Sequence, residues 1–347
     1  GIIIVILSTL SYYFVERPAR NKNNKSKVIL SLILISISVL VIFNFNIIQK
    51  DGYKGRLPEI LQKNLTDPWN LLKNLDGENC HKNIEGCRFS ISLNKKVYII
   101  GDSLIASLMF DLKDRIVKNN YQFITTTFNG CLFYPGFNMV YVKTQKIDEV
   151  CNDNYFQKLK QNLSNEKNSI IILGGRFPLY LSNYYFDNLE GGVEGNEWEH
   201  KYVSVGKYDT IQESFKNEVL ELSKNNKIIL IYPLPEAGWD PNNKIYNKRV
   251  RQKSSKNFNL ENITTSYKVY KNRTKSSFEL LNSIQGENIY RVYPHSLFCD
   301  TIIKDRCETH DKNYLFYRDE NHPSLKGAEM INDLIMKEIE KIELKSN

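Results

Sequence analysis

A stretch of 21 residues without a charge, residues 28–48 (VILSLILISISVLVIFNFNII), constrains this chain more than any other feature. At about 1.5 Å per residue, a helix of that length reaches about 30 Å, the thickness of a bilayer's hydrocarbon core. A buried helix of a soluble protein rarely carries so continuous an apolar surface. The stretch therefore predicts a transmembrane helix over residues 28–48, with the remainder of the chain on either side of a membrane.

Positive charges are distributed unevenly around this stretch. Five Lys and Arg residues lie within residues 17–27, whereas few follow the stretch closely. Because cytoplasmic flanks carry the excess of positive charge, residues 17–27 are expected in the cytoplasm and everything after Gln49 outside. The rest of the net charge of +8 is scattered, without an arginine-rich helix or a basic stripe interleaved with aromatic residues. Binding to nucleic acid is therefore not expected.

The six cysteines test this orientation independently, because all of them follow the apolar stretch. Their number is even, they form close pairs along the chain, and no Cys-x-x-Cys spacing indicates a zinc site. An oxidising compartment would join them as disulfides in one of fifteen connectivities, and the alternative is six unpaired buried thiols. The simplest connectivity pairs Cys80 with Cys87, Cys131 with Cys151 and Cys299 with Cys307.

The first 20 residues (GIIIVILSTLSYYFVERPAR) open with an apolar run of about 13 residues. Such a run is too short to span a bilayer, and it lacks the basic n-region and the small-residue cleavage site of a signal peptide. The segment is interpreted as the end of a longer membrane helix, so a preceding membrane portion is expected outside this sequence.

From Lys96 onward, short apolar runs alternate with amphipathic stretches, whereas residues 49–95 show little periodicity and are expected to form an extension between membrane and domain. The runs predict strands over residues 96–101, 121–127, 169–174, 227–233 and 288–293. Helices are predicted over residues 103–118, 152–165, 210–225, 262–285 and 324–341. This alternation is typical of an α/β/α domain, here residues 96–347, whose parallel sheet is covered on both faces and binds ligands at the carboxyl ends of its strands.

Gly-Asp-Ser at residues 101–103 lies where the first predicted strand meets the first predicted helix. Glycine permits a tight turn and a close backbone approach, and a serine hydroxyl at the edge of a sheet could act as a nucleophile. Asp and Ser are also ordinary residues at helix starts. The tripeptide alone therefore does not decide whether Ser103 is a nucleophile or a helix cap.

A second motif, near the end of the sequence, favours the nucleophile. Asp319-x-x-His322 precedes the last amphipathic stretch, so it is expected in a loop at the carboxyl edge of the sheet. His322 could take the proton of Ser103 while Asp319 orients the imidazole, as in a Ser-His-Asp triad. Separately the two residues could be a surface histidine and a turn-forming aspartate, but together with Gly-Asp-Ser they favour a catalytic site.

An oxyanion hole needs hydrogen-bond donors beyond the N–H of Ser103. Gly130, after the second strand, could offer a backbone N–H. Arg176, after the third strand, could direct its guanidinium to the same oxygen or to an acidic saccharide. The alternatives are a loop glycine beside a disulfide and a surface arginine. The other histidines lack comparable context and are expected to be structural or on the surface: His81, His200, His295 and His310.

These motifs resemble those of known families. Gly-Asp-Ser at 101–103 with Asp319-x-x-His322 is similar to the first and last blocks of the SGNH hydrolase superfamily, named for its Ser, Gly, Asn and His. Residues 11–20 (SYYFVERPAR) resemble the closing Glu-x-Pro-x-Arg signature of the acyltransferase family 3 membrane domain. With a further membrane helix and an exported domain, the order of parts is similar to that of bacterial surface-polysaccharide O-acetyltransferases.

The resemblance implies a flavodoxin-like SGNH domain that takes part in an acyl relay. A membrane domain, of which residues 1–20 would be the end, would take acetyl from acetyl-CoA, and Ser103 would receive it and pass it to a polysaccharide such as lipopolysaccharide. The fragment itself is expected to bind no cofactor and no metal. The implied location is the bacterial inner membrane, multi-pass, with the SGNH domain in the periplasm.

One block departs from the superfamily pattern. Where the third block has Gly-x-Asn-Asp, this sequence reads GGRF at residues 174–177, as fused SGNH domains of this type similarly tend to do. The oxyanion donor therefore stays open, and Gly130 matches the second block only by position. Two other functions stay open: an extracytoplasmic esterase with the same triad, and a non-catalytic glycan-binding module, against which the intact Ser103, Asp319 and His322 argue.

Overall fold

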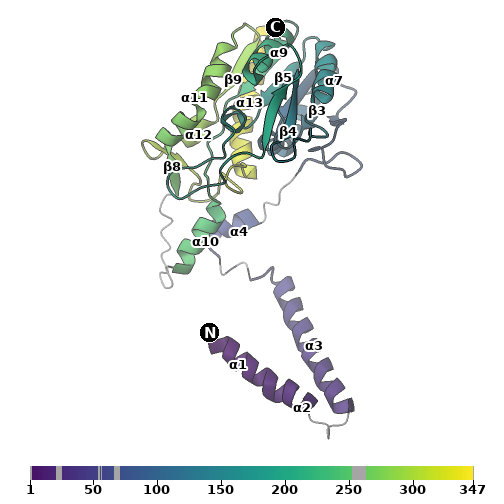
Figure 1. Ribbon diagram of the computed structural model, residues 1–347, viewed down its shortest axis with the longest axis vertical. Coiled ribbons are helices and arrows are strands. Elements are labelled where there is room, and N and C mark those ends of the chain that lie inside the picture. Colours follow the sequence, from purple (N-terminus) through teal and green to yellow (C-terminus); the bar gives the residue numbers. More distant parts are fainter. Residues whose placement is uncertain are drawn as a thin grey trace. The chain divides into compact units, whose positions relative to one another are not determined.

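The computed structural model describes residues 2–20, 26–53, 55, 57–65, 71–251 and 263–346. The chain divides into two compact units, Gly1–Leu57 and Pro58–Asn347. The smaller unit is helical, and the larger unit is built on a β-sheet (Figure 1).

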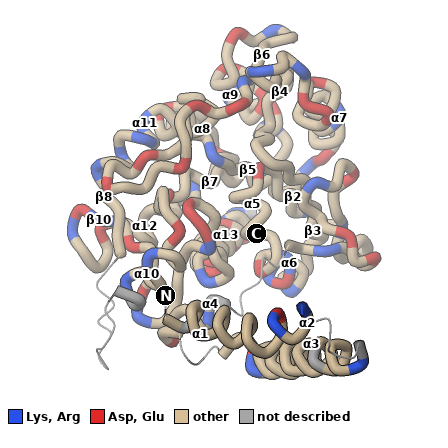
Figure 2. The backbone as a smooth tube through the Cα atoms, turned by 60° about the horizontal axis from the view of Figure 1, so that its bottom comes forward, with Lys and Arg blue, Asp and Glu red and all other residues tan. Residues whose placement is uncertain are grey.

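The helices of the smaller unit are α1 (Ile2–Ser11), the π-helical turn η1 (Tyr12–Glu16), α2 (Arg17–Arg20) and α3 (Ser26–Gln49). Figure 2 shows α3 without charge along most of its length. Among the described residues, one helix is long and apolar enough to cross a membrane, Lys27–Gln49, with a mean hydropathy of 2.8. Lys22 and Lys25, from the basic cluster that precedes it, lie outside the described residues. The predicted helix is confirmed, and its crossing of a membrane stays a prediction.

A six-stranded sheet in the order β1-β3-β2-β5-β7-β9 forms the centre of the larger unit. The strands are β1 (Cys87–Phe89), β2 (Lys96–Gly101), β3 (Gln122–Thr127), β5 (Ile170–Gly174), β7 (Lys227–Ile231) and β9 (Ile289–Val292). All five predicted strands are confirmed, and they run parallel. β1 pairs antiparallel with β3. Residues 49–95, expected to be an extension, therefore supply the edge strand β1. This strand is too short to produce an alternating pattern of apolar and polar residues in the sequence.

Helices cover both faces of the sheet, because its strands bury apolar side chains on both sides. α6 (Met109–Lys118) and α13 (Leu325–Ser346) pack on one face. α7 (Asp153–Ser164), α9 (Ile211–Ser223) and α11 (Tyr267–Ser283) pack on the other. The three-layer α/β/α class predicted from the sequence is confirmed.

The strand order locates the site. Numbered along the chain, the parallel strands stand in the order second, first, third, fourth, fifth, a doubly wound arrangement that binds ligands where the winding direction reverses. That point lies between β2 and β5, whose register pairs Gly101 with Gly174. Glycine is required at 101, since a Cβ would collide with the carbonyl oxygen of Gly174 and with Ile105. The residues that follow β2 and β5 are thereby brought close together.

The remaining elements surround this framework. Two small antiparallel sheets pair β4 (Phe137–Tyr141) with β6 (His200–Ser204) and β8 (Thr264–Ser266) with β10 (Arg306–Glu308). The short helices are α4 (Glu59–Leu65), α5 (Ser103–Ala106), α8 (Phe177–Ser182), α10 (Pro241–Arg251) and α12 (His295–Phe298). The predicted helix 103–118 is divided into α5 and α6. Residue 262, where another helix was predicted to begin, lies outside the described residues, and that helix begins at Tyr267.

All six cysteines form disulfides, in the simplest connectivity: Cys80–Cys87, Cys131–Cys151 and Cys299–Cys307. The first bond ties the edge strand β1 to the loop before it. The second joins the turn after β3 to the loop before α7. The pairing predicted from the sequence is confirmed.

Candidate active site

The turn after β2 shows which of its residues caps the helix. Asp102 is the N-cap of α5, because its Oδ1 accepts a hydrogen bond from the N–H of Leu104 at 2.9 Å. Its Oδ2 accepts from the N–H of Arg176 at 2.6 Å and from the hydroxyl of Tyr180 at 2.5 Å. Asp102 is buried, and capping does not involve the hydroxyl of Ser103.

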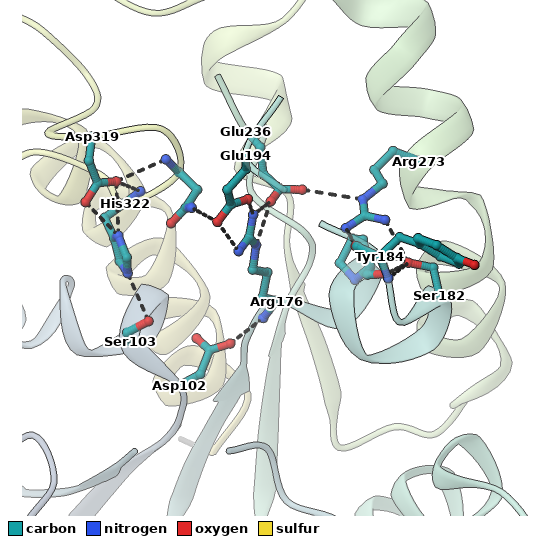
Figure 3. Close-up of polar contacts among 12 residues, drawn as sticks. Asp102, Ser103, Arg176, Ser182, Tyr184, Glu194, Glu236, Arg273, Asp319 and His322 are labelled. Carbon is teal, nitrogen blue, oxygen red and sulfur yellow. Dashed lines mark hydrogen bonds and ion pairs between the residues drawn. The ribbon is translucent and has the colours of Figure 1, made fainter. Parts of the chain in front are cut away.

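The loop before α13 brings the predicted base and acid to that hydroxyl (Figure 3). His322 Nε2 lies 2.9 Å from Ser103 Oγ, and His322 Nδ1 lies 2.9 and 3.0 Å from the two carboxylate oxygens of Asp319. Because a carboxylate only accepts hydrogen bonds, we assign the ring proton to Nδ1, which leaves Nε2 to accept from the Ser103 hydroxyl. The structure thus brings Ser103, His322 and Asp319 together in the geometry of a Ser-His-Asp triad.

Asp319 is held in its ionised form. Burial raises its pKa, but hydrogen bonds from the His322 ring and from the backbone of His322 and Asn321 outweigh burial and bring the pKa below its ordinary value. The backbone N–H groups of Asn321 and His322 donate to Oδ1 at 3.1 and 2.8 Å. An ionised carboxylate at this position fixes the tautomer of the ring and stabilises positive charge on it.

Backbone hydrogen bonds hold the loop that carries this acid and base. The N–H of Arg318 donates to the carbonyl of His322 at 3.0 Å and closes the turn. The carbonyl of Glu320 accepts from the N–H groups of Ala237 and Gly238, each at 2.9 Å. The loop after β7 therefore supports the loop before α13, although the two are distant in sequence.

The structure does not direct the Arg176 side chain to Ser103. Its Nε donates to Glu236 at 2.6 Å, one terminal nitrogen donates to Glu194 at 2.9 Å, and the other terminal nitrogen contacts both carboxylates. Arg176 is only 8 % exposed, and Figure 3 shows its guanidinium directed toward these partners. The expectation that this guanidinium faces the oxyanion or an acidic saccharide is therefore corrected, because the buried carboxylate of Glu236 and the partly buried carboxylate of Glu194 engage it.

Gly130 lies in the turn after β3, the strand beside β2. Its φ of +64° lies in the left-handed region that favours glycine, and a Cβ would approach the ring of Trp198 to 3.2 Å. Its carbonyl accepts a hydrogen bond from the Tyr202 hydroxyl at 2.7 Å. The Tyr202 hydroxyl thus holds the Gly130 carbonyl at the carboxyl edge of the sheet, and the part of Gly130 in an oxyanion hole stays a prediction.

His81 comes from the disulfide-bonded segment before β1 and is buried. Its ring nitrogens lie 3.0 Å from Thr127 Oγ1 and 2.7 Å from Asn129 Oδ1. Burial lowers its pKa and outweighs the opposing hydrogen bond to Asn129, so the ring is neutral at pH 7. The contacts tie the segment to the end of β3, which is a structural role.

Four residues whose side chains bond to Asp102, to Arg176 or to each other near the triad were not singled out from the sequence: Tyr180, Glu194, Glu236 and Asn321. They belong to separate loops and a short helix, and no fixed spacing relates them. The only sequence signal for them is indirect, since Arg176 at a strand end calls for carboxylate partners. Within the described ranges, no three His, Cys, Asp or Glu side chains gather as a metal ion would need.

Fold and site together define a class. A doubly wound parallel sheet with a serine after its first parallel strand, and with a His–Asp pair in the loop before its last helix, is the layout of an SGNH-type serine hydrolase domain. A family model described as "SGNH domain (fused to AT3 domains)" matches residues 73–337, and the chain belongs to this family. The match includes β1 and its disulfide, whereas residues 11–20 lie outside it.

Several solved structures are similar to this chain. The lipopolysaccharide acetyltransferase periplasmic domain of Salmonella ser. Paratyphi A matches with 17% identity and a TM-score of 0.48, covering 76% of this chain and 92% of that one. A lipolytic G-D-S-L family protein from Veillonella parvula matches with 11% identity and a TM-score of 0.35, covering 70% and 97%. Both TM-scores are below 0.5, so the membership of this chain in the SGNH family rests on the family model. No curated protein matches the chain.

Proposed function

We propose that this protein transfers an acyl group, most simply acetyl, to a hydroxyl of a cell-surface or exported polysaccharide. The observation that carries the proposal is the hydrogen-bonded line from Ser103 through His322 to Asp319, with 2.9 Å at each step. It occurs in a member of a family whose SGNH domains are fused to AT3 domains, that is, to membrane acyltransferases. Such a fusion would provide the serine with a source of acyl groups.

In the first half-reaction, Ser103 Oγ attacks the carbonyl carbon of the acyl donor while His322 Nε2 takes the hydroxyl proton. The tetrahedral intermediate collapses, the leaving group departs with that proton, and an acyl-serine remains. Asp319 stabilises the transient imidazolium. The N–H groups of Ser103 and Gly130 are the proposed donors to the oxyanion, since this chain lacks the Asn of the superfamily's third block.

In the second half-reaction, a sugar hydroxyl gives its proton to His322 Nε2 and attacks the acyl carbonyl of Ser103. The new ester bond forms as the bond to Oγ breaks, and the proton returns to Oγ. Water can attack the same intermediate, in which case the domain acts as an esterase. Transfer and hydrolysis therefore share every protein group and differ in which hydroxyl reaches the acyl-serine first.

The proposed setting is the outer side of a bacterial cell membrane. Three disulfides fit an oxidising compartment, and helix α3 fits an anchor in the bilayer. Acetyl-CoA is a cytoplasmic compound, so the acyl group would have to reach Ser103 through a membrane domain. Residues 1–20 are proposed to belong to that domain.

Trapping the intermediate tests the proposal. The full chain in detergent is incubated with p-nitrophenyl acetate, and the peptide that contains Ser103 should gain the mass of one acetyl group, whereas Ser103→Ala should not. Addition of a deacetylated surface polysaccharide should then divert the acetyl group from water to sugar. Rapid hydrolysis of acetylated polysaccharide without any transfer would assign the esterase function instead. An unmodified Ser103 would exclude both.

A further inference from the structure

Four charged side chains beside the triad form an ion cluster, which consists of Arg176, Glu194, Glu236 and Arg273. Arg176 contacts both carboxylates, and Arg273 Nε lies 3.7 Å from Glu236 Oε2. The members come from the loop after β5, the loop between α8 and β6, the loop after β7, and α11. Two positive and two negative charges balance within the cluster.

Burial makes this ion cluster different from a surface salt bridge. Its side chains are between 4 % and 15 % exposed. Exposed ion pairs contribute about 0–1 kcal/mol, and buried pairs are often no more stabilising than apolar residues of the same volume. Net stability is therefore a weak reason for placing four charges here. The connections of the cluster indicate a different reason.

One side of the ion cluster is joined to the nucleophile. The N–H of Arg176 donates to Asp102 Oδ2 at 2.6 Å, and Asp102 caps the helix that begins at Ser103. The same residue therefore contributes its guanidinium to the cluster and its backbone to the turn that presents the serine.

The other side is joined to the base. Asn321 Nδ2 donates to Glu194 Oε1 at 3.0 Å, and this oxygen also accepts from Arg176. The backbone N–H of Asn321 donates to Asp319 Oδ1 at 3.1 Å. Hydrogen bonds thus run without interruption from the nucleophile turn, through the ion cluster, to the carboxylate that orients His322 (Figure 3).

We propose that Arg176, Glu194 and Asn321 are positioning residues that set the distance between Ser103 and His322. The proposal rests on the proposed function, because it gives that distance a catalytic meaning. Ser103 begins helix α5 and His322 lies in the loop before α13, 219 residues further along the chain, so contacts between these two segments help to fix their separation. A misplacement of about 1 Å can cost about 10²-fold in rate. Arg176 therefore acts on the reaction through geometry, without touching the oxyanion.

Asn321→Ala is the mildest way to cut this connection, since every charge of the ion cluster keeps a partner. For hydrolysis of p-nitrophenyl acetate by the full chain in detergent, we expect kcat to fall about tenfold and KM to change less than about threefold. Asn226→Ala is the matched control. Asn226 is also buried, and its Nδ2 donates to the carbonyls of Glu166 and Leu222 at the opposite edge of the sheet. An equal kcat in Asn321→Ala and wild type, or an equal fall in both variants, would overturn the proposal.

An exchange of side chains tests whether the Glu194–Asn321 contact itself matters. Asn321→Asp sets two carboxylates against each other, and kcat should fall about 10²-fold. Adding Glu194→Gln replaces the lost donor, because an amide again faces a carboxylate, and kcat should recover at least about tenfold. A double variant no faster than Asn321→Asp alone contradicts the proposal.

A crystal structure of Asn321→Asp separates this proposal from the proposed function. The distance between Ser103 Oγ and His322 Nε2 should lengthen from 2.9 Å to beyond hydrogen-bond reach, whether or not the wild type turns over an ester. A lengthened distance with an inactive wild type would leave the positioning role standing and remove the proposed function. An unchanged distance would remove the positioning role, with an active wild type keeping the proposed function.

Discussion

Each edge of the central sheet carries a network around a glutamate, and the two networks differ in what they connect. At the amino edge, Glu166 accepts hydrogen bonds from Lys96 at 2.8 Å, Tyr98 at 2.8 Å and Ser169 at 3.1 Å. These partners lie on or beside the neighbouring strands β2 and β5. The Glu166 side chain is 17 % exposed, so water shares in its solvation.

At the carboxyl edge, Glu194 and Glu236 have partners from three separate segments, and their side chains are 15 % and 4 % exposed. At the amino edge, the pairing of β2 with β5 already fixes the positions of the residues there, so the Glu166 network adds only local stabilisation. The loops at the carboxyl edge lie outside the ladder of the central sheet, and the ion cluster joins them in addition to backbone bonds such as those from Ala237 and Gly238 to Glu320. In this domain, the buried ion cluster therefore lies where the central sheet alone does not fix the positions of the catalytic residues.

The largest effect should come from the nucleophile itself. Ser103→Ala removes the attacking oxygen and should lower hydrolysis of p-nitrophenyl acetate at least about 10⁴-fold, with Tm close to that of the wild type. Ser107→Ala is the control, since its hydroxyl donates to the carbonyl of Ser103 from the following turn and has no part in proton transfer. Residual activity above about a hundredth of the wild-type rate would place the nucleophile elsewhere.

The next largest effect is a difference in stability between variants at the two edges of the sheet. Arg176→Met leaves Glu236 with Arg273 as its cluster partner and takes the positive partner away from Glu194, and it should lower the free energy of unfolding by about 3–5 kcal/mol. Glu166→Gln, at the more exposed edge, should lower it by about 1–2 kcal/mol. Urea unfolding followed by tryptophan fluorescence measures both. Equal losses of unfolding free energy in the two variants would show that the ion cluster and the Glu166 network do not differ in their contribution to stability.

A smaller effect is expected where the Tyr180 hydroxyl reaches Asp102. Tyr180→Phe removes one of three donors to that carboxylate and should lower the free energy of unfolding by about 1 kcal/mol. The cap on α5 and the link to Arg176 remain, so kcat should stay within about threefold of the wild type. A loss as large as that of Asn321→Ala would show that the nucleophile turn depends on Tyr180 as well as on the ion cluster.

The smallest effect concerns the dependence of stability on pH. Burial lowers the pKa of His81, so between that value and about pH 6.5 the unfolded chain binds a proton that the folded chain does not. Stability is therefore lost as the pH falls below about 6.5. Melting curves from pH 7.5 to 5 should show a shallower decline in His81→Gln. Burial lowers the pKa of His200, His295 and His310 in the same direction, so part of the decline should persist.

The parallel strands and the triad could be predicted because each is encoded locally. A buried strand is a short apolar run, and each half of the triad is a compact motif beside a strand or helix boundary. Pairing the two motifs then required only the rule that parallel strands end at a common edge. The disulfides could be predicted for a similar reason, because each cysteine pairs with a cysteine close to it in sequence.

What could not be predicted depends on contacts between distant loops. The sequence left Arg176 open between the oxyanion, an acidic saccharide and the surface, because its partners, Glu194 and Glu236, have no recognisable spacing relative to it. Asn321 stands inside the Asp-x-x-His motif as an unassigned position, yet its side chain provides the link to the ion cluster. Strand β1 was not predicted because its three residues are too few to show an alternating pattern. Local patterns therefore revealed the reacting groups, and only the structure revealed their supports.

The short spacing between Asp319 and His322 has a consequence for how the domain acquires reactivity during synthesis. The acid and the base form one preassembled turn, so a single long-range contact, between His322 and Ser103, completes the triad. A growing chain must add 219 residues after Ser103 before this base exists. Until then the serine is an ordinary alcohol, which protects the emerging chain from premature acylation and hydrolysis at its own active site.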